Sequence, residues 1–167
     1  MSATLYLLDA NVLINAKNFY YAFDQVPEFW EWLVDQGVRG KVKIPREVFE
    51  EITGGDDELS LWAGRADVKT ALLLDEDVDI ALVREVTTNG YAADLSDVEQ
   101  DQVGADPFIV AHARKGAGRA VVTSEVSKPT AQRARRKLPD VCATFGVKCC
   151  NPFEFSRALN FRTNWRK

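Results

Sequence analysis

The sequence contains few of the features that mark membrane, secreted or zinc-binding proteins. None of its 167 residues fall in a stretch approaching the ~20 consecutive apolar residues of a membrane span. Its N-terminus lacks the basic-then-apolar layout of a signal peptide. The three cysteines, Cys142, Cys149 and Cys150, form no C-x-x-C pair, so we expect them to pack as small apolar side chains. These absences predict a cytoplasmic protein without a membrane partner.

The chain also lacks repeats, low-complexity tracts and linkers rich in proline, glycine or serine, so we expect residues 1–167 to form one domain. Short apolar runs alternate with helical patterns, which predicts an α/β three-layer sandwich around a central, mainly parallel sheet of four to five strands. The expected strands are 4–9, 42–44, 119–123 and 146–149, with a weaker one between 72 and 82. The expected helices are 11–20, 27–37, 45–53, 57–66, 76–89, 106–116 and 152–160. We place four aromatic residues in the core rather than at an interface: Phe29, Trp30, Trp32 and Trp62.

Basic residues are scarce in the first 100 residues, and acidic residues are scarce in the rest of the chain. Residues 1–100 have 8 Lys/Arg and 20 Asp/Glu, whereas residues 101–167 have 13 Lys/Arg and 5 Asp/Glu, so a net charge of −4 hides an acidic part and a basic part. The basic part could hold a polyanion, be a solvated face, or dock an acidic partner. It contains two clusters: Arg133, Arg135, Arg136 and Lys137, then Arg157, Arg162, Arg166 and Lys167.

A carboxylate follows the first apolar run directly. Residues 4–8 read as a buried strand, Asp9 ends it, and an amphipathic helix follows from Asn11. In parallel α/β sheets, ligands bind at the carboxyl ends of the strands. Asp9 is therefore well placed for chemistry and poorly placed for packing.

The helix predicted over 45–53 carries three glutamates. Its apolar stripe is formed by Pro45, Val48, Phe49 and Ile52. Glu51 lies ~110° from the centre of the stripe, whereas Glu47 and Glu50 lie ~150° from it, by helical geometry. We therefore expect Glu51 to border a cleft and the other two glutamates to be solvated.

A further acid stands at the expected start of the helix over 106–116. Asp106 followed by Pro107 is typical of a helix N-cap and first helical position. Such a position can also aim a carboxylate across the end of the sheet. The only histidine, His112, lies on another face of this helix, so we expect no catalytic role for it. The acidic run over 75–79 is interpreted as the beginning of a helix.

The fourth acid repeats the arrangement at Asp9. A short apolar strand ends in Thr123, Ser124 and Glu125. With Asp9, Glu51 and Asp106, Glu125 would place four carboxylates around one cleft. Clustered carboxylates repel unless cations neutralise them, and an all-oxygen ligand set suits Mg²⁺ or Mn²⁺. These metals act on phosphodiesters, which would give the basic part of the chain a function.

The four segments, in this order, resemble the motifs of PIN domains. Residues 8–14 resemble the opening motif, 44–52 the second acidic motif, 105–111 the third and 122–125 the fourth. Residues 137–142 and 146–149 also resemble a poorly characterised PIN-like subfamily of prokaryotes. The resemblance covers nearly the whole chain.

The resemblance implies a compact α/β sandwich and a Mg²⁺- or Mn²⁺-dependent endoribonuclease, in many members the VapC-type toxin of a toxin–antitoxin pair. It carries over Asp9, Glu51, Asp106 and Glu125 as catalytic and metal-binding acids, with Asn11 and Thr123 supporting the site. Glu125 departs from the family pattern, because that position usually holds Asp. The expected partners are an RNA, a cognate antitoxin and, as is common in the family, a second copy of the chain. The RNA backbone would lie on Arg133, Arg135, Arg136 and Lys137.

Two other classes of function fit parts of the pattern. A catalytically silent PIN-like module would bind nucleic acid or protein without hydrolysis. An aspartyl-phosphate phosphatase also begins with an acid after a strand, but it normally has a second Asp two residues later, where this chain has Asn11.

Overall fold

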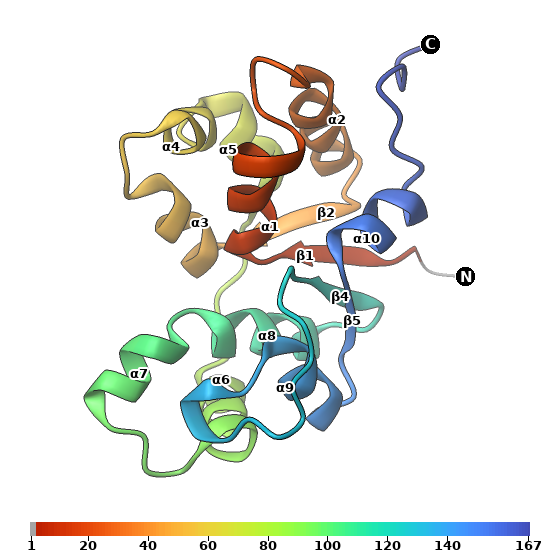
Figure 1. The fold of residues 1–167 in the computed structure, drawn as a ribbon. Helices are drawn as coiled ribbons and strands as arrows, with labels where there is room; N and C mark the ends of the chain where they lie inside the picture. Colours follow the sequence, from red (N-terminus) through yellow and green to blue (C-terminus); the bar gives the residue numbers. More distant parts are fainter. Residues whose placement is uncertain (1–2) are drawn as a thin grey trace.

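The computed structural model describes residues 3–167 and contains one parallel five-stranded sheet of order β3-β2-β1-β4-β5 (Figure 1). Every strand pair is parallel. The chain is thus an α/β protein with helices on both faces of the sheet, as predicted. The strands are β1 (Leu5–Leu8), β2 (Val42–Pro45), β3 (Leu73–Leu74), β4 (Arg119–Val122) and β5 (Lys148–Cys150).

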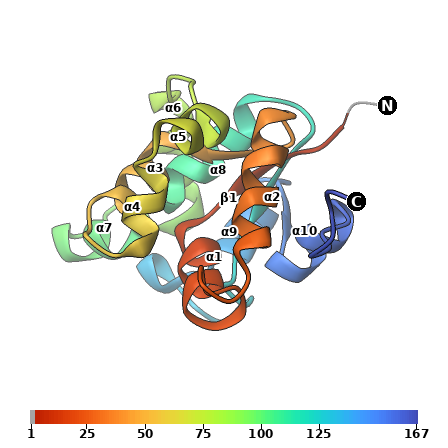
Figure 2. The same cartoon turned by 90° about the horizontal axis from the view of Figure 1, so that it is seen from above.

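Two helical layers cover the sheet (Figures 1 and 2). One layer contains α1 (Ala10–Asn15), which continues into the π-helix η1 (Ala16–Tyr20), and then α2 (Pro27–Val38), α3 (Arg46–Thr53), α4 (Glu58–Ala63) and α5 (Ala66–Leu72). The opposite layer contains α6 (Ile80–Glu85), the π-helix η2 (Val86–Tyr91), α7 (Asp97–Val103), α8 (Asp106–Lys115), the short 3₁₀-helix η3 (Arg133–Arg135) and α9 (Leu138–Thr144). The last helix, α10 (Pro152–Ala158), lies beside α2 and the sheet.

The core follows from the apolar strands. Leu7, Leu8, Val121 and Val122 are fully inaccessible, because helices cover both faces of β1 and β4. The four aromatic residues predicted to be core are at most 6 % exposed, which confirms that prediction. Among the described residues all three cysteines are free thiols; Cys142 is buried, and Cys149 and Cys150 are half-buried.

The register of the two central strands sets the position of the site. Leu8 of β1 pairs with Val122 of β4, so the residues that follow both strands leave the sheet side by side. The backbone N–H of Asp9 donates to the carbonyl of Val122 at 3.0 Å. Asp9 and Thr123 are therefore neighbours at the carboxyl edge of the sheet, although 114 positions separate them in the chain.

Several element boundaries differ from those predicted. Helices α5, α7 and α9 occupy segments for which no separate helix was expected. The acidic run over 75–79 precedes helix α6 instead of forming its first turn. Its last residue, Asp79, is the N-cap of α6, and its side chain accepts hydrogen bonds from the N–H groups of Ala81 and Leu82. Pro45 ends β2 and caps α3 instead of starting the helix.

Within residues 3–167, no helix combines the length and apolarity needed to cross a membrane.

Candidate active site

Asp9 is held in place by the start of α1 and by β4. It is the N-cap of α1, and its carboxylate accepts a hydrogen bond from the Ala10 N–H at 2.8 Å and from the Thr123 hydroxyl at 2.9 Å. Only 7 % of the residue is exposed. Burial raises the pKa of Asp9 to about 6; the Thr123 and Ala10 hydrogen bonds oppose the rise, and the charges of Glu125 and Glu51 add to it.

Asn11 and Thr123 form the hydrogen-bonded support beneath Asp9. The Asn11 amide donates to the Thr123 hydroxyl at 3.1 Å and accepts from the Ser124 N–H at 2.9 Å. The Thr123 hydroxyl also accepts from the Glu125 N–H at 3.1 Å. Because the Thr123 hydroxyl accepts these two hydrogen bonds, its single proton is donated to Asp9, which fixes the direction of that hydrogen bond.

Asp106 is the first residue of α8, and this corrects the prediction that it caps the helix. Ala105 holds the cap position, no side chain caps the helix, and Pro107 is the second helical residue. The Asp106 carboxylate is therefore not used to satisfy the helix terminus. Burial, together with the charges of Asp9, Glu125 and Glu51, raises its pKa to about 8, while Lys137 opposes the rise.

The two glutamates differ in their exposure and in their contacts. Glu51 is the most open of the four acids, and partial burial of its carboxylate raises its pKa. One carboxylate oxygen of Glu125 accepts the N–H of Leu138, the first residue of α9, at 2.6 Å. Glu125 therefore also ties the segment over 126–137 to the edge of the sheet.

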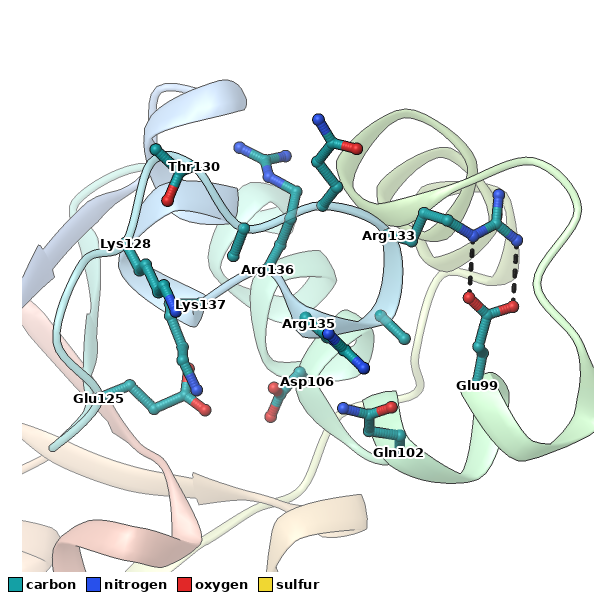
Figure 3. A pocket seen from close by; sticks show the side chains of 13 residues that line it. Glu99, Gln102, Asp106, Glu125, Lys128, Thr130, Arg133, Arg135, Arg136 and Lys137 are labelled. Carbon is teal, nitrogen blue, oxygen red and sulfur yellow. Dashed lines mark hydrogen bonds and ion pairs between the residues drawn. The ribbon is translucent and has the colours of Figure 1, made fainter.

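A cleft of about 1000 Å³ opens beside these acids (Figure 3). Asp106 and Glu125 form one wall, and the segment over 128–137 forms the other. Asp9 and Glu51 are not on its wall, although their charges act on Asp106. Within residues 3–167, no three His, Cys, Asp or Glu side chains converge closely enough to hold a metal ion as they stand.

The cations predicted to bind RNA are not equivalent. Arg133 forms ion pairs with Glu99 and Asp94, both at 2.8 Å. The Arg136 guanidinium donates to the carbonyls of Gly90 and Asp140. Both side chains are thus engaged by the protein itself, and Figure 3 shows the Arg136 guanidinium turned away from the acids.

Three cations remain for a ligand in the cleft. Lys128, Arg135 and Lys137 line it and form no salt bridge within the described chain. Lys128 was missed from the sequence, although it follows Glu125 by only three residues. The second basic cluster, at 157–167, does not line the cleft. It includes Arg166, which pairs with Glu31 at 3.4 Å.

Two hydroxyls near the acids were also missed. Tyr91 Oη and Ser124 Oγ are buried and have no hydrogen-bond partner among residues 3–167. Burial, followed by the charges of Asp106 and Glu125, raises the pKa of Tyr91, so its hydroxyl stays a neutral donor. Tyr91 ends a π-helical turn, a feature over-represented at functional sites, and no sequence pattern indicated it.

Comparison with known proteins gives a family and no characterised relative. The family model described as "Domain of unknown function (DUF4411)" matches residues 6–163. No curated protein and no solved structure matches the chain.

Proposed function

We propose that this chain, which belongs to the DUF4411 family of domains of unknown function, is a metal-dependent ribonuclease that hydrolyses RNA phosphodiester bonds. One observation carries the proposal: buried, mutually repelling carboxylates stand at the carboxyl edge of a parallel sheet, beside a cleft whose other wall has free cations. The resemblance to PIN domains supports the same conclusion.

The acids suit a divalent cation by their chemistry. All four are oxygen donors, and the pKa values of Asp9 and Asp106 are raised by burial and by neighbouring carboxylates, so a bound cation would relieve the repulsion among these acids. The orphaned hydroxyls of Tyr91 and Ser124 add polar groups without partners beside them. Asp9 and Asp106 would hold Mg²⁺ or Mn²⁺, with Glu51 and Glu125 completing the site. When bound, such an ion stabilises the developing charge on a phosphodiester and lowers the pKa of water.

The protein's own groups prepare the acids for this role. Thr123 donates to Asp9 and so favours its ionised form. Asn11 orients Thr123, and Leu138 orients Glu125 through its N–H group. Asp9 and Glu125 are thereby restricted in direction before any ligand enters, which lowers the cost of reorganisation during the reaction.

The free cations would hold the RNA backbone. Lys128, Arg135 and Lys137 face the acids across the cleft, so phosphates bound to them would place a neighbouring phosphodiester at Asp106 (Figure 3). Contacts of this kind supply affinity and register rather than sequence choice.

Cleavage of RNA by purified protein tests the proposal. Wild-type chain with Mn²⁺ should cut a labelled RNA, and Asp9→Asn should lose the activity, because the amide keeps the shape and removes the charge. Glu50→Gln, an exposed neutralisation on α3, is the matched control and should cut at the wild-type rate. Equal cleavage by wild type and Asp9→Asn would reveal a contaminating nuclease and overturn the assignment.

A catalytically silent PIN-like module is the second candidate. It is favoured by the spacing of the acids, since no three of the described ligand-type side chains converge as they stand. Such a module would bind RNA through Lys128, Arg135 and Lys137 with or without Mn²⁺ and leave the RNA intact. RNA binding that is unaffected by chelators and leads to no cleavage would support this second candidate.

The cellular setting we propose is a toxin–antitoxin pair. A small antitoxin would cover the acidic wall of the cleft, and a second copy of the chain could form a homodimer. Co-expression with the neighbouring small gene should yield a complex that no longer cuts RNA. Failure to co-purify, together with harmless expression of the chain alone, would contradict this setting.

A further inference from the structure

A second cluster of charged groups surrounds a buried histidine, away from the cleft. His112 of α8 is completely buried, and both of its ring nitrogens face carboxylates. Nδ1 is 3.1 Å from Glu76 Oε1, and Nε2 is 3.2 Å from Glu47 Oε2. Glu47 was expected to be solvated; it instead points inward, because α8 supplies a polar partner that the helical pattern of α3 does not reveal. His112 is the only histidine in the chain.

Arg119 fixes the protonation state of one side of this cluster. Its guanidinium donates to both carboxylate oxygens of Glu76, at 2.9 and 2.8 Å, and to the His112 carbonyl at 2.7 Å. Arg119 is the main cause that lowers the pKa of Glu76 to about 2, so Glu76 is ionised. Nδ1 of His112, facing an ionised acceptor, must carry a proton to form a hydrogen bond.

The other ring nitrogen has the same requirement. Nε2 lies 3.2 and 3.4 Å from the two oxygens of Glu47, and no arginine or lysine of the described chain pairs with Glu47. A neutral imidazole has one N–H, so it would present a lone pair to one of the two carboxylates. A doubly protonated ring satisfies both carboxylates at once.

The charges then balance within the cluster. The groups that face His112 are Glu47 on α3, Glu76 on the segment after β3, and Arg119 on β4. Lys115, on α8 itself, acts on Glu76. With an imidazolium, the two cations in direct contact, His112 and Arg119, meet the two anions Glu47 and Glu76, which is the condition under which buried charges are tolerated.

We infer that His112 is a buried imidazolium that fastens α3 to α8 and thereby acts as a positioning residue for the acids of the cleft. Glu47 lies one helical turn before Glu51 on α3, and Asp106 begins the helix that carries His112. A change at this contact would move the two acid-bearing helices relative to each other. The positioning role rests on the proposed ribonuclease function, whereas the protonation state does not.

Nitrogen NMR of the single histidine tests the protonation state directly. In wild-type protein labelled with ¹⁵N-histidine, both ring nitrogens should resonate as protonated nitrogens near neutral pH. In Glu47→Gln the Nε2 nitrogen loses its carboxylate partner, so its signal should shift from the wild-type position, and Glu50→Gln on the same helix should leave it unchanged. One protonated and one bare ring nitrogen in wild-type protein would overturn the inference.

Kinetics test the positioning role. Glu47→Gln should lower kcat for RNA cleavage by about tenfold or more with KM within twofold, because displaced catalytic groups lose rate rather than binding. An unchanged kcat in Glu47→Gln would overturn the positioning role. If wild-type protein cuts no RNA, the positioning role is overturned together with the proposed function. The NMR result still shows whether His112 is doubly protonated.

Discussion

Burial distinguishes the four acids more sharply than their sequence positions do. Asp9 and Asp106 have pKa values raised to about 6 and about 8, because burial and the charges of neighbouring carboxylates both oppose their ionisation. Glu51 is open to solvent, and one carboxylate oxygen of Glu125 accepts a hydrogen bond from the N–H of Leu138. The aspartates are therefore the residues whose ionisation a bound cation would change most.

Neutralising Asp106 should stabilise the protein in the absence of metal. In the unfolded chain this carboxyl ionises near its ordinary value of 3.8, whereas in the folded chain it keeps its proton up to about 8. Stability is therefore lost as pH rises between these values, and it is retained below them. At pH 8 the free energy of unfolding is lowered by about 2 kcal/mol, a figure reduced to allow for the partial exposure of Asp106.

Asp106→Asn should accordingly melt about 4–8 °C above wild type at pH 8 without metal, and the two should melt together near pH 4. Thermal unfolding by circular dichroism measures this. Asp101→Asn, an exposed neutralisation on α7, is the control and should follow wild type at both pH values. A lower melting temperature for Asp106→Asn at pH 8 would contradict the burial of the acid.

At the scale of elements, the basic segment over 126–137 is the least predictable part of the site. The sequence predicted four equivalent cations, but Arg133 and Arg136 are engaged in holding the segment to α7, η2 and α9. Both partnerships depend on elements that were not predicted as such. Helix α7 begins with a capping box of Ser96 and Glu99, a pattern that can be recognised from sequence.

Lys137→Ala and Arg135→Ala should each weaken RNA binding by several-fold and reduce the dependence of log Kd on log salt by about 0.7 for a single-stranded RNA, because each removes one phosphate contact. Fluorescence anisotropy of a labelled RNA over a series of salt concentrations measures both effects.

Arg162→Ala, a cation from the second basic cluster, is the control and should bind as wild type does. A loss of affinity with Arg162→Ala equal to that with Lys137→Ala would place the RNA elsewhere on the surface.

At the scale of the whole molecule, the parallel sheet explains why the sequence predicted part of the site. Acids after two strands must meet at one sheet edge, so Asp9 and Glu125 could be placed together from their positions alone. The contacts among Glu47, Glu76 and His112 could not be predicted, because the three residues lie on three elements whose rotation and spacing depend on packing. The same holds for Tyr91, whose burial beside the acids results from the π-helical turn that carries it.

The central claim is that the acids of this sheet edge bind a divalent cation for phosphodiester hydrolysis. Calorimetric titration with Mn²⁺ at pH 7, in two buffers of different ionisation enthalpy, tests it most directly. Asp106, with its pKa raised to about 8, is mainly protonated at this pH, so binding should release close to one proton. We predict micromolar-to-millimolar binding with buffer-dependent heat, absent in Asp9→Asn. No binding to wild type, or equal binding to Asp9→Asn, would contradict the claim.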